Sequence, residues 1–346
     1  MPRPAADTPL RIRLLALPET SASALYGLYD VLASVGSVWP ALTGEAITVA
    51  APDVAIVGET RTPFAGHLGV PIAPQASFAD NAPADIVIVS DLAIALDEDP
   101  RGRWPAAGAF LQRQFAQGAT ICSVCSGAVL LADAGLLDGL EATTHWGAVD
   151  LFRRFFPQVR LHAERILVPA GPAHRIVTSG GAASWEELAL HLIARFVDPA
   201  EAVRTAKVFV LGDRSEGQLP FASLGKPRRH EDALIADLQA WIADHYHQPN
   251  PVARMAARSG LAERSLSRRF KTATGYAPVD YVQALRIEES KQLLERSRDT
   301  VEAIALAVGY EDPAFFRRIF KRRTGTSPAR YRQRFQNLGR TGNGAG

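Results

Sequence analysis

The sequence predicts an α/β sandwich with a largely parallel sheet in its first half and an all-α domain in its second half. Three observations lead to this. Short apolar runs alternate with helical patterns in the first half, a helical unit is duplicated in the second, and the two halves differ in charge. At 346 residues the chain is long enough for two domains of ordinary size.

The alternating pattern of the first half is typical of β-α-β folds. The β-like runs are 11–17, 46–51, 85–90, 119–124 and 174–179. Helical patterns lie between several of them, at 21–35, 104–117, 126–136, 147–156 and 182–196. The segment 211–229 mixes Gly, Pro, Ser and charge without a clear period, so we expect a linker there.

The two halves carry opposite net charge. Residues 228–346 contain 21 Lys and Arg against 13 Asp and Glu, a net charge of +8. Residues 1–227 contain 17 against 23, a net charge of −6. A basic module attracts polyanions, so this division predicts a nucleic-acid-binding C-terminal module joined to an acidic module with another task.

Composition indicates a cytoplasmic globular protein. The chain is 47% hydrophobic and 21% charged, and two cysteines in so long a chain favour a reducing compartment over a disulfide framework. The N-terminal stretch lacks the apolar core of a signal peptide, and no apolar run approaches the length of a membrane span. We expect no cofactor, and no metal site, because the histidines of "HYH" (245–247) have no ligand cluster nearby.

The second half contains a duplication. "VARMAARSG" (252–260) resembles "VEAIALAVG" (301–309), and after a one-residue insertion Phe270, Gly275 and Pro278 match Phe320, Gly325 and Pro328. Each copy reads as a helix, a Gly-containing turn, a second helix, T-G-x-x-P and a further helix. Two helix-turn-helix units in tandem explain this repeat.

The second helix of each copy, 263–273 and 312–323, has one apolar and one basic face. The apolar positions are Leu266 and Phe270 in the first copy and Phe315, Phe316, Ile319 and Phe320 in the second. Arginine pairs with guanine and lysine contacts phosphates, so we interpret the other faces as DNA-binding rather than merely solvated. They comprise Arg264, Ser267, Arg268, Lys271, Ala314, Arg317, Arg318 and Lys321.

Residues 231–336 resemble the DNA-binding domain of the AraC/XylS transcription regulators. The second copy, "VEAIALAVGYEDPAFFRRIFKRRTGTSPARYRQRF", carries the signature of that family, and 278–296 corresponds to its long connecting helix. The resemblance implies that helices 263–273 and 312–323 enter successive major grooves. It places the base-reading positions on Arg264, Ser267, Arg268, Ala314, Arg317 and Arg318.

Both cysteines lie in "ICSVCSGAVLLADAGLLDG" (121–139), where an apolar run leads to Cys125 and a helix follows. This element resembles the nucleophile elbow of the PfpI-type and class I glutamine-amidotransferase-like superfamily, and "TTHWG" supplies His145. From about residue 10 to 336 the chain resembles the GlxA family of AraC-type regulators. The resemblance implies a flavodoxin-like PfpI-type sandwich (1–210), the linker, an all-α AraC-type double helix-turn-helix domain (230–336) and a flexible tail (337–346).

Catalysis at Cys125 requires a thiolate, a base and oxyanion donors. His145 is the candidate base, but small residues near Ala24 replace an acid that the superfamily often has there. Asp91-Leu92 stands where the superfamily has a Pro-Gly-Gly-like turn. We therefore expect no catalytic residue. Cys125, Ser126, Gly127 and His145 are interpreted as a pocket for an anionic or zwitterionic group.

The leading hypothesis is a one-component transcription regulator. Its acidic domain senses a small molecule and forms a homodimer, while its C-terminal domain binds promoter DNA and acts with RNA polymerase. The resemblance implies a nitrogen-containing metabolite, such as a betaine or an amino acid, as effector. One alternative is a cysteine amidohydrolase or peptidase with a DNA-binding appendage. The other is a thiol redox sensor that uses the C-x-x-C spacing of Cys122 and Cys125.

Overall fold

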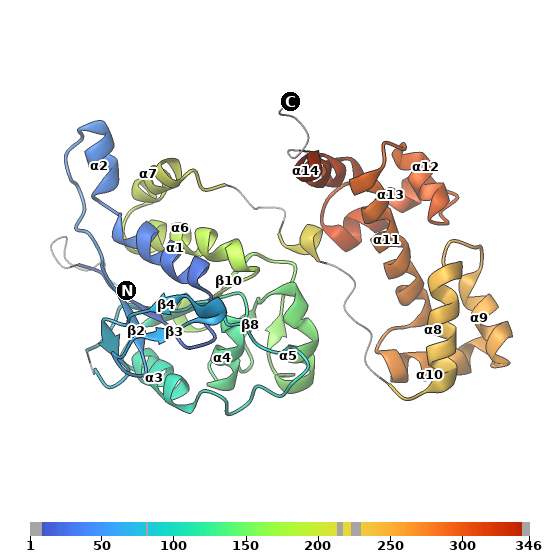
Figure 1. Cartoon of the computed structure of the whole chain (residues 1–346), viewed down its shortest axis with the longest axis horizontal. Helices are drawn as coiled ribbons and strands as arrows, with labels where there is room; N and C mark the ends of the chain where they lie inside the picture. The colour runs from blue at the N-terminus through green and yellow to red at the C-terminus, as the bar shows by residue number, and fades with distance from the viewer. Residues whose placement is uncertain (1–8, 81, 213–216, 223–229, 341–346) are drawn as a thin grey trace. The chain divides into compact units, whose positions relative to one another are not determined.

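The computed structural model describes residues 9–80, 82–212, 217–222 and 230–340. The chain divides into two compact units, Met1–Gln218 and Leu219–Gly346. The first unit is α/β and the second is helical (Figure 1), which confirms the predicted fold class. Within the described ranges, no helix is long and apolar enough to cross a membrane.

The first unit is built on a seven-stranded sheet in the order β10-β11-β7-β6-β1-β2-β5, parallel except between β10 and β11. Its strands are β1 (Arg11–Leu15), β2 (Asp53–Gly58), β5 (Ala76–Ser77), β6 (Ile86–Val89), β7 (Thr120–Val124), β10 (Leu167–Ala170) and β11 (Ile176–Ser179). Two small ladders accompany it, formed by β3 (Phe64–Ala65) with β4 (Pro71–Ile72) and by β8 (Glu141–Ala142) with β9 (Arg160–Leu161).

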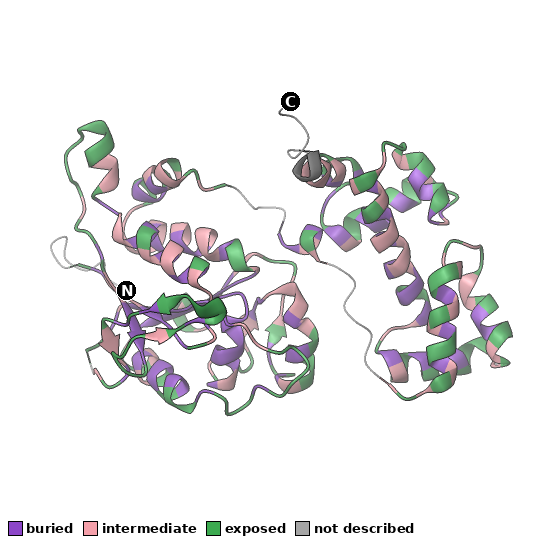
Figure 2. Cartoon of the chain, in the orientation of Figure 1, coloured by how far each residue is buried: buried purple, intermediate pink, exposed green. Residues whose placement is uncertain are grey.

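Helices bury both faces of the sheet, as parallel strands require. Ile12 and Leu14 of β1 join the core beneath α1, α6 and α7, whereas Leu15 joins the core beneath α3, α4 and α5. The central strands β6, β7 and β11 are buried at every residue, and buried (purple) segments run through the first unit in Figure 2. The helices are α1 (Ala22–Ala33), α2 (Val38–Thr43), α3 (Pro105–Ala116), α4 (Gly127–Asp133), α5 (Val149–Phe155), α6 (Trp185–Phe196) and α7 (Pro199–Phe209).

One predicted strand is wrong. Residues 46–51 are mostly exposed and lie outside any strand, whereas β2 is Asp53–Gly58, after Pro52. Both runs are apolar, but only "DVAIVG" aligns with β1, where Ile56 and Val57 are almost fully buried. The tertiary pairing, not local hydrophobicity, therefore selects the strand. The predicted pattern also missed the helices α2 and α7.

The second unit consists of seven helices in its described part. They are α8 (Ala233–His245), α9 (Pro251–Ser259), α10 (Glu263–Thr274), α11 (Pro278–Arg296), α12 (Val301–Ala307), α13 (Pro313–Thr324) and α14 (Pro328–Arg340). The helix α14 enters the segment predicted as a tail, and 341–346 lie outside the described residues.

The duplication repeats in detail. Gly275 and Gly325 end α10 and α13 in the left-handed conformation, with φ of 84° and 74°. The threonine before each glycine donates its hydroxyl to a phenylalanine carbonyl at 2.8 Å, Thr274 to Phe270 and Thr324 to Phe320. Each phenylalanine contacts a tyrosine of the following helix, with ring centroids 5.4 Å apart in the first copy and 5.5 Å in the second. The same contacts therefore end both helices.

Arg286 of α11 joins the two copies. Its guanidinium donates to the carbonyls of Tyr246, Gln248 and Gly309 at 2.8, 3.0 and 2.8 Å. Because the first two carbonyls precede α9 and the third follows α12, one side chain holds segments from both helix-turn-helix units. Burial lowers the pKa of Arg286.

We expect Arg286→Met to lower the free energy of unfolding of the second unit by about 2–4 kcal/mol, because the carbonyls lose a charged donor. Chemical denaturation of the full chain measures the change. Arg296→Met, at an exposed position of the same helix, is the control and should change stability by less than about 0.5 kcal/mol. Equal effects of the two substitutions would contradict the bridging role.

Candidate functional site

Cys125 occupies a strained turn between β7 and α4. Its φ is +56°, a left-handed value that non-glycine residues rarely adopt, and only 7% of the residue is exposed. Two hydrogen bonds hold the turn: its N–H donates to the carbonyl of Ser179 and its carbonyl accepts from the hydroxyl of Thr144, both at 2.9 Å. The elbow predicted from the sequence is present at this position.

The start of α4 packs closely against the end of β6. A Cβ atom at Gly127 would lie 2.6 Å from the carbonyl oxygen of Ser90, so only glycine fits there. The hydroxyl of Ser126 accepts from the N–H of Leu92 at 3.0 Å and donates to the Leu92 carbonyl at 2.5 Å. The N–H of Leu92, a backbone donor that follows β6, is therefore already hydrogen-bonded to a side chain.

His145 is half-buried and lies in the loop that follows β8. Its Nδ1 accepts from the N–H of Gly147 at 3.0 Å, so the proton of the neutral ring resides on Nε2. Burial lowers its pKa, which favours that neutral form. Within the described residues, no hydrogen bond joins His145 to Cys125, and the bond that His145 Nδ1 accepts comes from the backbone.

Asp91 is a buried residue near Cys125 that the sequence marks only as a departure from the Pro-Gly-Gly-like turn of the superfamily. It is 8% exposed, and burial raises its pKa. Three buried oxygens near the ends of β6 and β7 have no hydrogen-bond partner among the described residues: Oγ of Ser90, Oδ1 of Asp91 and Oγ of Ser123. In the sequence, Asp91 is a charged residue directly after an apolar strand. Ligands of α/β sheets bind at this end of the strands.

The environment suppresses the Cys125 thiolate. Burial, followed by the negative charge of Asp91, raises the pKa of Cys125 to about 12. Cys122, fully buried in β7, also has a raised pKa because of burial, and both cysteines are free. Nucleophilic attack and thiol oxidation both proceed through the thiolate, so neither is favoured by these surroundings.

The predicted DNA-binding faces are exposed on α10 and α13. Leu266 and Phe270 are completely buried, which confirms the apolar stripe of α10. Every predicted contact residue is exposed except Ser267, which is half-buried; the exposed ones are Arg264, Arg268, Lys271, Ala314, Arg317, Arg318 and Lys321.

Two details of α13 differ from the prediction. Phe315 was assigned to the buried side, yet it is 40% exposed and carries the Arg318 guanidinium over its ring at 5.7 Å. Its place in the core is taken by Phe316, which is completely buried. Arg317 forms an ion pair with Glu302 of α12, a contact that the sequence pattern did not predict. No cluster of three or more potential metal ligands occurs in the described part of the chain.

Comparison with known proteins assigns both units. The DJ-1/PfpI family matches residues 12–195, more than half of the chain, and a helix-turn-helix domain family matches 255–334. The HTH-type transcriptional regulator CdhR of Pseudomonas aeruginosa is 33% identical over 240 residues, which are 68% of this chain and 69% of that protein. The regulator GlxA of Rhizobium meliloti is 28% identical over 226 residues, 65% of this chain and 68% of that protein.

Among solved structures, a ThiJ/PfpI family protein from Pseudomonas syringae aligns with 75% of this chain and 95% of its own, with a TM-score of 0.48 and 19% identity. The family matches and the identity to CdhR agree with the elbow at Cys125 and with the duplicated helical unit. The chain therefore belongs to the AraC-type helix-turn-helix transcription regulators of the GlxA kind, in which a DJ-1/PfpI-type domain precedes the DNA-binding domain.

Proposed function

We propose that the first unit binds a small-molecule effector and that this binding controls how the second unit engages promoter DNA. The observation that carries the proposal is the pair of buried oxygens without a hydrogen-bond partner among the described residues, Oγ of Ser90 and Oδ1 of Asp91, at the end of β6, where the Asp91 charge acts on Cys125 in its strained turn. Buried polar groups in folded proteins almost always have partners, and strained backbone concentrates at functional sites. A ligand with N–H or O–H donors would satisfy these oxygens.

In this proposal Cys125, Ser126, Gly127 and His145 line the effector site, and Asp91 extends it. Of the anionic and zwitterionic groups that the sequence suggested, the carboxyl of Asp91 favours the zwitterionic one, because its amine can donate to the carboxyl. The helix α4 has seven residues and offers only a short dipole to an anion. An effector acts only if it binds the DNA-competent and incompetent states with different affinity.

We further infer that the site performs no turnover. A hydrolase needs a thiolate, a base and free oxyanion donors, whereas here the thiol is buried beside a carboxyl. His145 uses Nδ1 to accept a backbone hydrogen bond, and the Leu92 N–H is bonded to Ser126. These three features support a binding role for the same elbow that related folds use for nucleophiles.

In the second unit we propose that α10 and α13 read two adjacent major-groove sites. Arg264, Ser267, Arg268, Ala314, Arg317 and Arg318 would lie at base edges, with Lys271 and Lys321 at phosphates. The exposure of these side chains and the +8 charge of the segment support this arrangement. A homodimer formed through the first unit would double the number of boxes engaged, and contact with RNA polymerase would convert binding into regulation.

We expect each protomer to contact two short DNA sites, or boxes, about one helical turn (~10 bp) apart. Arg268→Ala and Arg318→Ala should each weaken binding to the preferred sequence by about 1–3 kcal/mol and relax the sequence preference at one box. In vitro selection from a random DNA library, followed by titration, measures both effects. Lys271→Ala is the matched control, because loss of a phosphate contact weakens all sequences alike. Unchanged preference in both arginine variants would disprove the assignment.

Substitutions at Cys125 separate a pocket wall from a nucleophile. Cys125→Ser retains size and a hydrogen-bonding atom, so the effector response of a promoter reporter should survive. Cys125→Leu fills the site, so the response should be lost while DNA binding without effector is retained. Loss of the response in Cys125→Ser, together with consumption of the effector by the wild-type protein, would show a nucleophile instead.

The charge of Asp91 predicts a pH effect. Asp91→Asn removes a negative charge that opposes thiolate formation, so the pKa of Cys125 should fall from about 12, although burial remains the larger cause. The pH profile of Cys125 alkylation should therefore shift to lower pH, and Ser90→Ala is the uncharged neighbouring control. A wild-type profile with a midpoint below that of an ordinary cysteine would contradict the suppressed thiolate.

A further inference from the structure

Gln218 is the last residue of the first unit, and its side chain is docked in the loop that carries His145. Its Nε2 donates to the carbonyl of Thr144 at 2.8 Å, and its Oε1 accepts from the N–H of Trp146 at 3.1 Å. Longer contacts join Nε2 to the hydroxyl of Thr143 at 3.3 Å and to the carbonyl of Arg165 at 3.4 Å. Only 2% of Gln218 is exposed.

Two glycines shape the socket that receives this side chain. A Cβ atom at Gly180 would lie 2.8 Å from Nε2 of Gln218, so a larger residue would displace the amide. Gly217 has a φ of +72°, and a Cβ atom there would lie 2.2 Å from the carbonyl oxygen of Glu164. The chain thus reaches Gln218 through a turn that only glycine accommodates. The sequence suggested a linker over 211–229, of which 213–216 and 223–229 lie outside the described residues.

The same loop holds Cys125. Thr144 donates its hydroxyl to the Cys125 carbonyl at 2.9 Å, while its own carbonyl accepts from Gln218. Thr143 and Thr144 are completely buried. One residue, Thr144, is therefore hydrogen-bonded to both Cys125 and Gln218.

A second anchor follows three residues later, within the second unit. The ring of Phe221 meets Phe335 of α14 edge-on, with centroids 5.4 Å apart, and Lys291 of α11 donates to the Ala222 carbonyl at 2.5 Å. Phe335 packs on Tyr331, which contacts Phe320 of α13. Only Leu219 and Pro220 separate the two anchors in sequence, so the docking of Gln218 sets how much free chain precedes the DNA-binding unit.

We propose that Gln218 couples the Cys125 site to the DNA-binding unit. The proposal rests on the proposed function, in which an effector binds beside Cys125. An effector that shifts the loop of Thr144 and His145 changes the fit of Gln218 and releases it. The chain before Phe221 is then no longer held at Gln218, and this lowers the effective concentration of one unit near the other. Since coupling between sites is reciprocal, a substitution at Gln218 must also change the reactivity of Cys125.

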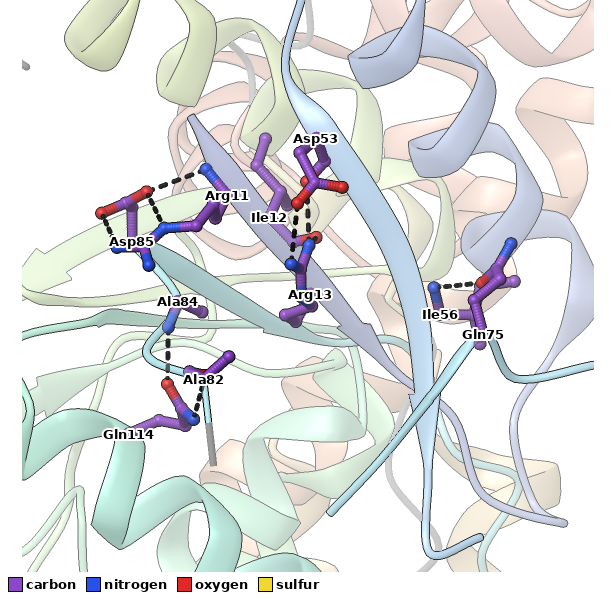
Figure 3. Close-up of polar contacts among 10 residues, drawn as sticks. All are labelled: Arg11, Ile12, Arg13, Asp53, Ile56, Gln75, Ala82, Ala84, Asp85 and Gln114. Carbon is purple, nitrogen blue, oxygen red and sulfur yellow. Dashed lines mark hydrogen bonds and ion pairs between the residues drawn. The ribbon is translucent and has the colours of Figure 1, made fainter. Parts of the chain in front are cut away.

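The first experiment tests the coupling in the reverse direction: Gln218 is changed and the reactivity of Cys125 is measured. In full-length protein carrying Cys122→Ala, Cys125 is the sole thiol, and its alkylation by iodoacetamide is followed by mass spectrometry. Gln218→Met retains the length of the side chain but removes its hydrogen bonds, so we expect alkylation about tenfold faster. The matched control is Gln114→Met. Gln114 is 1% exposed and bonds Ala82 and Ala84 before β6, away from the carboxyl ends of the strands (Figure 3), and its loss should leave the rate unchanged.

The second experiment runs in the forward direction and separates coupling from simple structural support. Methyl methanethiosulfonate adds a small group to Cys125, and hydrogen exchange is measured at the amide of Trp146 and over residues 217–222. We expect both to exchange several-fold faster in the modified protein. In the second unit, exchange in α10 is the control and should not change, because the contacts of Phe221 and Ala222 go to α14 and α11.

The outcomes decide the proposal without knowledge of the effector. Unchanged Cys125 alkylation in Gln218→Met, or unchanged exchange over 217–222 after modification of Cys125, overturns it. If Gln218→Met does not fold, Gln218→Glu retains the acceptor for Trp146 but cannot donate to Thr144, and the same two readouts apply. An effector response retained in Cys125→Leu would contradict the proposed function while leaving both readouts intact, so the two failures are distinguishable.

Discussion

The close packing of the start of α4 against the end of β6, directly after Cys125, is the constraint on which the first unit depends. Gly127 leaves no room for a side chain against the Ser90 carbonyl, and Ser126 binds both backbone groups of Leu92. This packing fixes the left-handed turn, buries the thiol and engages a backbone donor that an oxyanion would need. These features are the basis for the proposal that the elbow binds a ligand and performs no reaction.

The second unit depends instead on one set of local contacts that is repeated in both copies. In both copies a glycine ends the exposed helix, a threonine supports the turn, and a phenylalanine and a tyrosine pack across to the next helix. Because the supporting contacts are the same, α10 and α13 present their basic faces from equivalent frameworks. Arg286 adds a link that local repetition lacks, since its guanidinium bonds carbonyls belonging to both copies.

Between these units, side-chain docking defines the connection more than composition does. The segment after α7 is rich in Gly, Pro and Ser, yet Gln218 is buried in the first unit and Phe221 packs within the second. A polar side chain enters the first unit because backbone carbonyls and an N–H are available to satisfy its amide. The two anchors are thus set by individual side chains, Gln218 in the first unit and Phe221 in the second.

The sequence by itself determined the two architectures, the elbow at Cys125 and the duplicated helices, because these depend on local periodicity, glycine positions and short-range spacing. The family resemblance added the long connecting helix at 278–296, and these are the bounds of α11. Tertiary structure alone decided that β2 is Asp53–Gly58 rather than 46–51 and that Phe315 is exposed. It also decided that the charge of Asp91 acts on Cys125 and that Gln218 bonds the backbone of Thr144 and Trp146. The physical reason is common to all four: strand pairing, burial and the partners of a polar group depend on residues distant in sequence, and a local pattern contains no information about them.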